Sequence, residues 1–586
     1  MRSHIRWLAA PAWALAVMLA SPPARAEEAS ESDVAGAITA ALKKSDPSNK
    51  WKGVTWTDWR TGWQETGTAG PWAQMVLQTP GEQVWGQALF VGTDPSCQDS
   101  PGCDPSLHLL KCTPGGSECA ESRGSCQRMT SAVSAPDAGA PYLCAGPADN
   151  TLEVLYKLIT RATSTVDIVS LSAPDGRFRD MLRNALTWLA RSKRAVTVRI
   201  LIGDYTGARL NGTFYLIDVS QLLQDIVIEA NGVPDADNKL VVIAGRMRVL
   251  KGGEIDGWPH AKIIAVDGRE VVVGGENMWT DTYLSWSPVW DLNVHVRGEV
   301  AKDATRFLDE SWKYLCDKKQ NLDHASRRYV RSYDAARNQP GAPLVLESEC
   351  IKELALPTSQ PGGGYKMMGV GKLGSLDLNA DQSLVAQEAL IRVARKAVYL
   401  SQQDLKGITG FGYSERIMSA LADQIVAGRD VYLVKSGDGA GKGSTEPYAN
   451  GTLENVAREM KDYVKKAAGA PSDSKKLEDL LCKRFHLAPM RFNNISATYG
   501  DTHPPEPIPN HAKFIMADTT AFYVGSHNLY PSGNNMEYGL IVDSHDIALY
   551  GMWNKYWNQL WPRSKLSAVS GDDAPSCIYR KPDDKK

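Results

Sequence analysis

The first regular pattern of hydrophobic and polar positions lies in the N-terminal part of the chain. Residues 166–171 form a short apolar run typical of a buried strand. Residues 178–189 then repeat apolar side chains at helical spacing, and 196–202 form a second apolar run. This order predicts a strand, a helix that covers it, and a second strand.

The same pattern recurs in the C-terminal part. A strand is predicted at 397–402, a helix with one apolar face at 417–426, and a strand at 431–434, with Gly428 at the expected helix C-cap. Strand–helix–strand units with right-handed crossovers predict parallel sheets covered by helices. We therefore expect an α/β protein of two fused, pseudo-twofold-related α-β-α sandwich halves with mostly parallel sheets.

The length of the chain agrees with two halves. A single hydrophobic core stops growing at roughly 250 to 300 residues, and this chain has 586. A stretch rich in proline and glycine separates the two patterns. The predicted organisation is a signal peptide at 1–26, an N-terminal half at 27–351 with a cysteine-rich insertion at about 97–144, a linker at 352–374, and a C-terminal half at 375–586.

The first 26 residues have the pattern of a secretory signal. Arg2 and Arg6 precede an apolar stretch at 7–20, and Ala24-Arg25-Ala26 is a small-x-small cleavage site. The apolar stretch is interrupted by Pro11 and is shorter than the roughly 20 residues that a membrane anchor needs. We predict a soluble protein that is secreted or periplasmic.

An exported protein is expected to use its cysteines in disulfides. The ten cysteines are Cys97, Cys103, Cys112, Cys119, Cys126, Cys144, Cys316, Cys350, Cys482 and Cys577. The first six lie within 97–144, a stretch that is also rich in turn-forming residues. This pattern indicates a surface insertion that is cross-linked by disulfides. A zinc site is the alternative, but the chain has no CxxC pair.

Composition excludes several classes of protein. The chain is 43% hydrophobic and 23% charged, which excludes a fibrous or wholly disordered protein. Its net charge is -2 and it has no long run of lysine and arginine, so a nucleic-acid partner is not expected.

A paired motif carries the chemistry. In each half the spacing from the histidine is two residues to a lysine, seven to an aspartate and seventeen to an asparagine. The copies are His260-Ala261-Lys262, Asp267 and Gly274-Gly275-Glu276-Asn277 in the first half, and His511-Ala512-Lys513, Asp518 and Gly525-Ser526-His527-Asn528 in the second. One copy would be a weak motif, but two with identical spacing indicate a duplicated site.

Strand geometry explains the spacing. A histidine and a lysine two residues apart on a strand point to the same face and can reach one ligand. Asp267 and Asp518 stand at an odd offset, so we interpret these motif aspartates as structural partners of the site. A glycine pair before Asn277, and Gly525-Ser526 before Asn528, allow each asparagine to approach closely.

These side chains suit a phosphodiester. Lys262, Lys513 and the two asparagines can hold non-bridging oxygens as charge builds in the transition state. One neutral imidazole can attack phosphorus while the other, protonated, donates to the departing alcohol. Because neither half has both histidines, we expect the site at the interface of the halves. The scheme requires no metal or other cofactor.

The doubled motif resembles the signature of the phospholipase D superfamily, and more narrowly that of secreted actinomycete-type phospholipases D. The resembling segments run from Gly274 to Tyr283, from Ser401 to Leu405 and from Ala521 to Pro531, within a likeness that extends from about residue 50 to about 560. This resemblance implies that His260 forms a phosphohistidine and that His511 is the general acid and then the base.

The resemblance also implies residues around the histidines. Glu537, where the subgroup usually has aspartate, would pair with His260, and Asp291 with His511. Trp279, Tyr283 and Tyr448 match positions that line the choline and acceptor-alcohol site, where aromatic faces attract a quaternary ammonium.

Disulfide pairs are implied in the same way. Cys97 with Cys103, and Cys316 with Cys350, match pairs of the subgroup. The chain has no cysteine near Lys406, where the subgroup places a partner for the position of Cys482, and elimination then leaves Cys482 to pair with Cys577.

The leading hypothesis is a secreted phospholipase D, expected to be a monomer, that acts at a phospholipid membrane surface or micelle. It would hydrolyse phosphatidylcholine-type lipids to phosphatidic acid and free headgroup, or transfer the phosphatidyl group to small alcohol acceptors. A secreted nuclease of the same superfamily is the alternative enzyme, and a basic channel would distinguish it. A non-catalytic phosphate-binding or lipid-surface protein with a dead site is a third hypothesis, against which the complete motif in both halves argues.

Overall fold

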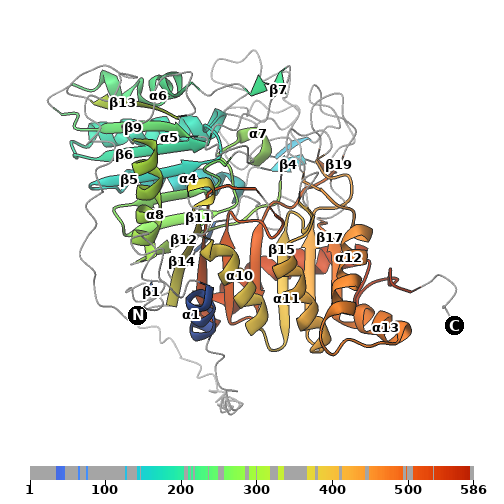
Figure 1. The fold of residues 1–586 in the computed structure, drawn as a ribbon. Coiled ribbons are helices and arrows are strands. Elements are labelled where there is room, and N and C mark those ends of the chain that lie inside the picture. Colours follow the sequence, from blue (N-terminus) through green and yellow to red (C-terminus); the bar gives the residue numbers. More distant parts are fainter. Residues whose placement is uncertain are drawn as a thin grey trace, which may run out of the picture. The chain divides into compact units, whose positions relative to one another are not determined.

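Two eight-stranded sheets form the framework of the protein, as the computed structural model shows (Figure 1). The structure describes residues 34–45, 64–65, 74–76, 126–128, 142–144, 147–203, 209–210, 213–214, 218–234, 237–247, 257–283, 289–298, 300–316, 328–334, 366–376, 381–407, 412–441, 448–491, 496–497, 506–531 and 533–580. The predicted signal peptide lies outside these residues, as does most of the predicted cysteine-rich insertion.

The first sheet has the strand order β13-β9-β6-β5-β10-β11-β12-β2. Its strands are β2 (Gln74–Val76), β5 (Thr165–Ser170), β6 (Thr197–Gly203), β9 (Val241–Met247), β10 (Ile263–Val266), β11 (Glu270–Gly274), β12 (Asn293–Arg297) and β13 (Arg328–Asp334). Side chains alternate between two faces. Val166 and Ile168 of β5 pack with helices α4 (Pro147–Thr160), α5 (Gly176–Arg191) and α6 (Val219–Val227), whereas Val169 packs with α8 (Val300–Leu315).

The second sheet has the order β1-β14-β22-β21-β20-β15-β16-β17. Its strands are β1 (Gln64–Glu65), β14 (Lys366–Lys372), β15 (Ala397–Gln402), β16 (Asp430–Lys435), β17 (Phe485–Pro489), β20 (Lys513–Ala517), β21 (Ala521–Gly525) and β22 (Glu537–Asp543). Its helices are α10 (Gln382–Val393), α11 (Glu415–Val426), α12 (Leu453–Lys466), α13 (Ser474–Arg484), the π-helix η5 (Ile547–Trp557) and α14 (Asn558–Ser564).

The remaining described elements are one longer helix and several short helices and strands. They are α1 (Val34–Ser45), α7 (Thr280–Tyr283), η2 (Ala230–Gly232), η4 (Gly374–Leu376), η6 (Lys565–Ser567), and the strand pairs β3 (Cys126–Arg128) with β4 (Tyr142–Cys144), β7 (Arg209–Leu210) with β8 (Thr213–Phe214), and β18 (Ser496–Ala497) with β19 (Glu506–Pro507). None of the helices described here is long and apolar enough to cross a membrane.

The predicted α/β class and the two halves are confirmed, but the sheets are mixed and not mostly parallel. Parallel pairing joins β5 to β6, β6 to β9, β15 to β16, and β16 to β17. The motif strands form the hairpins β10–β11 and β20–β21, which are antiparallel. A return strand after a tight turn can only run antiparallel, so the His–Lys motif itself dictates the mixed topology.

Two boundaries differ from the sequence prediction. Residues 366–372 of the predicted linker form β14, which pairs with β22 inside the second sheet. In addition, α1 packs against α10, and β1 pairs with β14, so residues assigned to the N-terminal half belong to the second sheet. Sequence periodicity could not predict this arrangement, because β1 is only two residues long.

One hydrophobic cluster spans both halves. It contains buried residues of β10 and β11, the inner face of α8, and the strands and helices of the second sheet. Phe307 of α8 lies against Tyr538 of β22, with ring centroids 5.1 Å apart. The halves therefore share a core, and α8 contributes to both.

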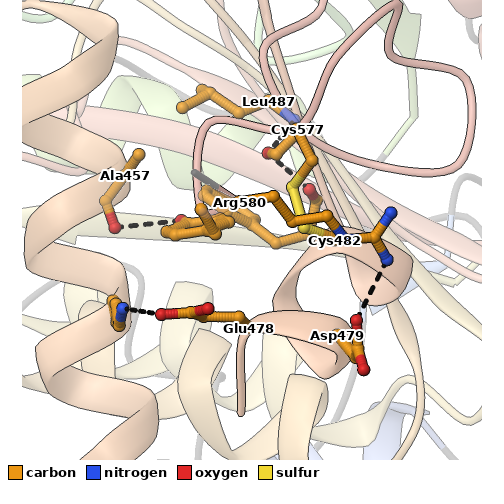
Figure 2. The surroundings of a disulfide bond; sticks show 11 residues. Ala457, Glu478, Asp479, Cys482, Leu487, Cys577 and Arg580 are labelled. Atoms are coloured by element: carbon orange, nitrogen blue, oxygen red, sulfur yellow. Dashed lines mark hydrogen bonds and ion pairs between the residues drawn. A yellow bond between two sulfur atoms is a disulfide. The ribbon is translucent and has the colours of Figure 1, made fainter. Parts of the chain in front are cut away.

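A disulfide joins Cys482 of α13 to Cys577 near the C-terminal end, as elimination predicted (Figure 2). Arg580 pairs with Asp479 of α13 beside this bond, and Glu478 pairs with Lys461 of α12. Cys316 is also disulfide-bonded. Its predicted partner Cys350 lies outside the described residues, as do Cys97 and Cys103.

Candidate active site

The two motif histidines lie at the start of the motif hairpins. His260 and Lys262 precede β10, His511 precedes β20, and Lys513 is the first residue of β20. The sequence prediction placed each His–Lys pair within a strand. Instead, each histidine lies in a segment that forms a short bridge to the opposite half.

The first bridge pairs Pro259 with Met536 in parallel orientation. The amide of His260 donates to the carbonyl of Met536 at 2.9 Å, and the amide of Met536 donates to the carbonyl of Trp258 at 2.8 Å. Because Glu537 follows Met536 directly, this bridge brings its carboxylate to His260.

The second bridge is the pseudo-symmetric counterpart and pairs Trp290 with Asn510. The amide of Trp290 donates to the carbonyl of Pro509 at 2.8 Å, and the amide of His511 donates to the carbonyl of Trp290 at 2.7 Å. Asp291, the next residue, is thereby brought to His511.

Each histidine thus pairs with a carboxylate from the other half. Nδ1 of His260 lies 2.8 Å from Oε2 of Glu537, and Nδ1 of His511 lies 2.7 Å from Oδ2 of Asp291. All four side chains are buried. A carboxylate at Nδ1 fixes the orientation of the ring and directs Nε2 to the chemistry.

Burial has the largest effect on the pKa of His260. It lowers the pKa of His260 to about 4, with Lys262 and Lys513 acting in the same direction against Glu537. Burial opposes ionisation of Glu537, but His260 and Lys262 lower its pKa to about 2. At neutral pH the pair therefore consists of a neutral imidazole and an ionised carboxylate.

The motif lysines and asparagines complete each half-site. Lys262 Nζ donates to the carbonyl of His260 at 2.5 Å, and Lys513 Nζ donates to the carbonyl of His511. Asn277 follows β11 and is fully buried, yet neither atom of its side-chain amide has a hydrogen-bond partner among the described residues. Oδ1 of the buried Asn528 also has no hydrogen-bond partner among the described residues. Buried polar groups of this kind point to a ligand with complementary polar atoms.

The motif aspartates lie at the opposite ends of these strands. The carboxylate of Asp267 accepts hydrogen bonds from the backbone amides of Thr163, Ser164 and Thr165 and from two of their hydroxyls, at 2.8 to 2.9 Å. The carboxylate of Asp518 accepts from the amides of residues 395–397. Both hold the turn that precedes a strand of the sheet, and neither joins a histidine pair.

The three aromatic residues differ in exposure. Tyr283 and Tyr448 are each 1% exposed and lie in T-shaped arrangements with His511, with ring centroids 6.4 and 5.5 Å from that of the imidazole. Trp279 is only partly buried. The structure thus places both tyrosines against the imidazole, and leaves ring surface open only on Trp279 among the three.

Sequence reasoning missed several polar contacts. Ser526 Oγ donates to Glu537 Oε2 at 2.6 Å, and the Tyr283 hydroxyl donates to Asp291 Oδ2 at 3.1 Å. The side chain of Asn510 donates to Ser401 and to the carbonyl of Val434, which anchors the segment before His511. The serine in place of glycine in the second motif copy was the one available signal.

A metal-binding group is not found among the described residues, since no three His, Cys, Asp or Glu side chains there are placed to hold an ion. The site instead offers a neutral buried imidazole, a second imidazole paired with a carboxylate, two lysines and two amides. These groups can attack phosphorus, donate a proton and bind non-bridging oxygens.

Two crossed histidine–carboxylate pairs with a lysine and an asparagine in each half form a duplicated site with the groups that cleavage of a phosphodiester requires. The chain is 27% identical over 527 residues to phospholipase D from Streptomyces antibioticus, covering 83% of this chain and 86% of that protein. The chain is thus similar to a phospholipase D over most of its length, in agreement with the resemblance that the doubled motif carries. No family model matches the chain.

The comparison with solved structures also gave matches. The phosphatidylserine synthase of Haemophilus influenzae Rd KW20 is 12% identical with a TM-score of 0.43, and the match covers 71% of this chain and 86% of that one. The phospholipase D family member Nuc from Salmonella typhimurium is 16% identical with a TM-score of 0.20, over 33% of this chain and 95% of that one.

Proposed function

We propose that the protein is a secreted phospholipase D that converts phosphatidylcholine-type lipids to phosphatidic acid and free headgroup, and transfers the phosphatidyl group to small alcohols. The observation that carries this proposal is the crossed arrangement of the pairs, His260 with Glu537 and His511 with Asp291. The name of the Streptomyces antibioticus relative supports the choice of a phospholipid substrate.

The first step is a displacement at phosphorus. His260 is the nucleophile, because its lowered pKa of about 4 leaves the imidazole neutral at neutral pH. Its Nε2 forms a bond to phosphorus while the bond from phosphorus to the headgroup oxygen breaks. His511, as imidazolium, gives its Nε2 proton to that oxygen, and the free headgroup alcohol leaves.

The second step reverses these roles. Neutral His511 removes a proton from water or from an acceptor alcohol, whose oxygen attacks phosphorus and breaks the bond to His260. Water yields phosphatidic acid, and an alcohol yields the exchanged phospholipid. The balance between hydrolysis and transfer is therefore a competition between two nucleophiles for one intermediate.

The cations and amides stabilise the charged phosphoryl group. Lys262 and Lys513 both contribute to the field at His260, so both halves supply positive charge to the same site. Asn277 and Asn528 offer buried amides from the ends of β11 and β21. Such groups act most strongly where charge develops in a water-poor site.

The aromatic residues recognise the headgroup in this proposal. Trp279 retains exposed ring surface, and an aromatic face attracts a quaternary ammonium such as choline. The signal-like pattern at 1–26 supports export to the exterior or the periplasm. A lipid surface is the corresponding partner, and the active form is a monomer that needs no cofactor.

The test is an assay of the purified mature protein on phosphatidylcholine vesicles in EDTA, with and without ethanol. We expect release of choline, and formation of phosphatidylethanol when ethanol is present, because both products arise from one phosphatidyl-enzyme. The variant His260→Ala is the control for contaminating activity. Single-stranded DNA is assayed in parallel, and cleavage of DNA with intact lipid would replace the proposal with a nuclease.

A further inference from the structure

Each carboxylate that orients a histidine also accepts a hydrogen bond from a hydroxyl group. In the pair of His260 and Glu537 that hydroxyl belongs to Ser526. Oε2 of Glu537 accepts from Ser526 Oγ at 2.6 Å and lies 2.8 Å from Nδ1 of His260. One oxygen of the carboxylate thus serves both the imidazole and the serine.

The equivalent position in the other half cannot supply a hydroxyl. Gly275 corresponds to Ser526 in the duplicated motif, and a Cβ atom at Gly275 would lie 2.3 Å from Oδ1 of Asp291. Contacts this short are not tolerated unless the buried carboxylate moves. A serine at Gly275 would therefore displace Asp291 from His511.

Tyr283 supplies the missing group from a different element. Its hydroxyl, on the last residue of α7, donates to Oδ2 of Asp291 at 3.1 Å and lies 3.0 Å from Nδ1 of His511. Oδ2 is also the oxygen that pairs with His511, at 2.7 Å. The contact therefore reproduces, by another route, the contact of Ser526 with Glu537.

We propose that Tyr283 is a positioning residue for the general acid, whose hydroxyl performs for Asp291 and His511 the role that Ser526 performs for Glu537 and His260. The inference rests on the proposed function, because it takes His260 as nucleophile and His511 as acid. It assigns Tyr283 a task in the proton transfer, in addition to any contact with a headgroup.

A donated hydroxyl has two effects on a buried carboxylate. It fixes the rotamer of the side chain, and it draws negative charge away from the oxygen that faces the imidazole. Without it, the carboxylate would hold an imidazolium more tightly and make it a weaker acid. Tyr283 would therefore help His511 to release its proton to the leaving group.

The groups around His511 and Asp291 include two that burial keeps from ionising, an aromatic ring and a lysine. Burial, reinforced by Asp291, raises the pKa of Glu276 well above its ordinary value and so favours the neutral form of this carboxyl. Burial likewise raises the pKa of Tyr556, and the negative charge of Asp291 acts in the same direction. The ring of Tyr448 lies in a T-shaped arrangement with the imidazole of His511. Lys513 Nζ donates a hydrogen bond to the backbone carbonyl of His511.

The groups around His260 and Glu537 include both motif lysines and His527. Lys262 and Lys513 lower the pKa of His260, and Lys262 and His527 lower that of Glu537, in each case beside the effect of burial. The two pairs are thus tuned differently, while each carboxylate keeps one hydroxyl. The hydroxyl contact to the carboxylate oxygen that faces the imidazole is thus present in both halves, and the proposal rests on this shared geometry.

The experiment measures kcat/KM against pH for Tyr283→Phe and Ser526→Ala, with short-chain phosphatidylcholine as substrate. The phenylalanine keeps the ring and removes only the hydroxyl. We expect Tyr283→Phe to move the basic limb of the profile to higher pH, by about half a unit to one unit, because one hydrogen bond to the carboxylate is lost. Ser526→Ala should move the acidic limb to higher pH, because Glu537 would then favour protonation of His260.

Tyr579→Phe is the matched control, since it removes a buried tyrosine hydroxyl that donates to the carbonyl of Ala457 at 2.9 Å, away from both pairs. This variant should leave both limbs in place. A uniform loss of kcat/KM in Tyr283→Phe with unmoved limbs, or an unchanged profile, would overturn the proposal and leave Tyr283 a packing residue.

Two outcomes separate this inference from the proposed function. If Tyr283→Phe moved the acidic limb and Ser526→Ala the basic one, the positioning role would stand and the assignment of nucleophile and acid would be reversed. If the wild-type protein did not cleave phosphatidylcholine, the same profiles measured with bis-(p-nitrophenyl) phosphate would still decide the role of Tyr283.

Discussion

Asp267 illustrates how a motif residue can act on the fold without joining the reaction. It adopts a positive φ of 52° at the turn of the β10–β11 hairpin, and its carboxylate collects five hydrogen bonds from residues 163–165. Those residues lead into β5, which pairs with β10. Asp518 has a φ of 57° and holds the segment that leads into β15 in the same way.

We expect Asp267→Asn to lower the free energy of unfolding by about 2 kcal/mol, because the amide cannot accept all of the bonds that the carboxylate accepts. The values of kcat and KM at 25 °C should change little. Denaturant unfolding and steady-state kinetics check this. Asp572→Asn, on an exposed residue, is the control. A large fall in kcat with unchanged stability would assign Asp267 to the chemistry.

The same residue gives a pH dependence. Burial opposes ionisation of Asp267, but the hydrogen bonds from Thr165 and Thr163 lower its pKa below the ordinary value of 3.8. The stability that it contributes is therefore present above about pH 4 and is lost as the pH falls through the lowered pKa. In Asp267→Asn this part of the acid sensitivity should be absent.

At the level of single residues, the sequence identified the paired histidines, lysines and asparagines from their spacing. The hydroxyl contacts were out of reach. Tyr283 is eight residues from Asp291, and Ser526 is eleven from Glu537, and in neither case do the two partners belong to the same helix or strand. Only the folded loops after β11 and β21 bring these groups together.

Among the elements, α13 and the C-terminal segment depend on the disulfide between Cys482 and Cys577. The bond closes a sequence separation of 95 residues, and beside it Tyr579 and Arg580 bond to α12 and α13 (Figure 2). These contacts fix the end of the chain against helices next to the β17 edge of the second sheet.

The double variant Cys482→Ser with Cys577→Ser should lose roughly 2 to 4 kcal/mol of stability, because the unfolded chain regains the freedom of a long loop. Its thermal unfolding midpoint is expected to fall, while activity at 25 °C is retained. Differential scanning calorimetry with a parallel activity assay checks both. Loss of activity without loss of stability would show that the bond shapes the site.

Several elements follow closely from periodicity. The predicted strand at 397–402 coincides with β15, and the apolar helical face at 417–426 lies within α11. The mixed pairing and the crossing of α1 and β1 to the second sheet did not follow, since a two-residue strand has no readable period and a sheet edge is chosen by tertiary contacts.

For the whole molecule, the crossed pairs predict strong coupling between the halves. His260→Ala and His511→Ala should each reduce kcat to nearly the level of the double variant, because nucleophile and acid act as one unit. Single-turnover and steady-state kinetics of the three variants check this. His545→Ala, a substitution at an exposed histidine, is the control. Additive losses would indicate two independent sites.

The bridges from Pro259 to Met536 and from Trp290 to Asn510 also bear on how activity is lost under stress. Each bridge holds one histidine of one half next to one carboxylate of the other, so a small separation of the halves breaks both pairs together. Because the proposed reaction needs both pairs, separation of either one stops turnover. During mild denaturation the enzyme should therefore switch off in an all-or-none manner, and turnover becomes a sensitive reporter of contact between the halves before the sheets themselves melt.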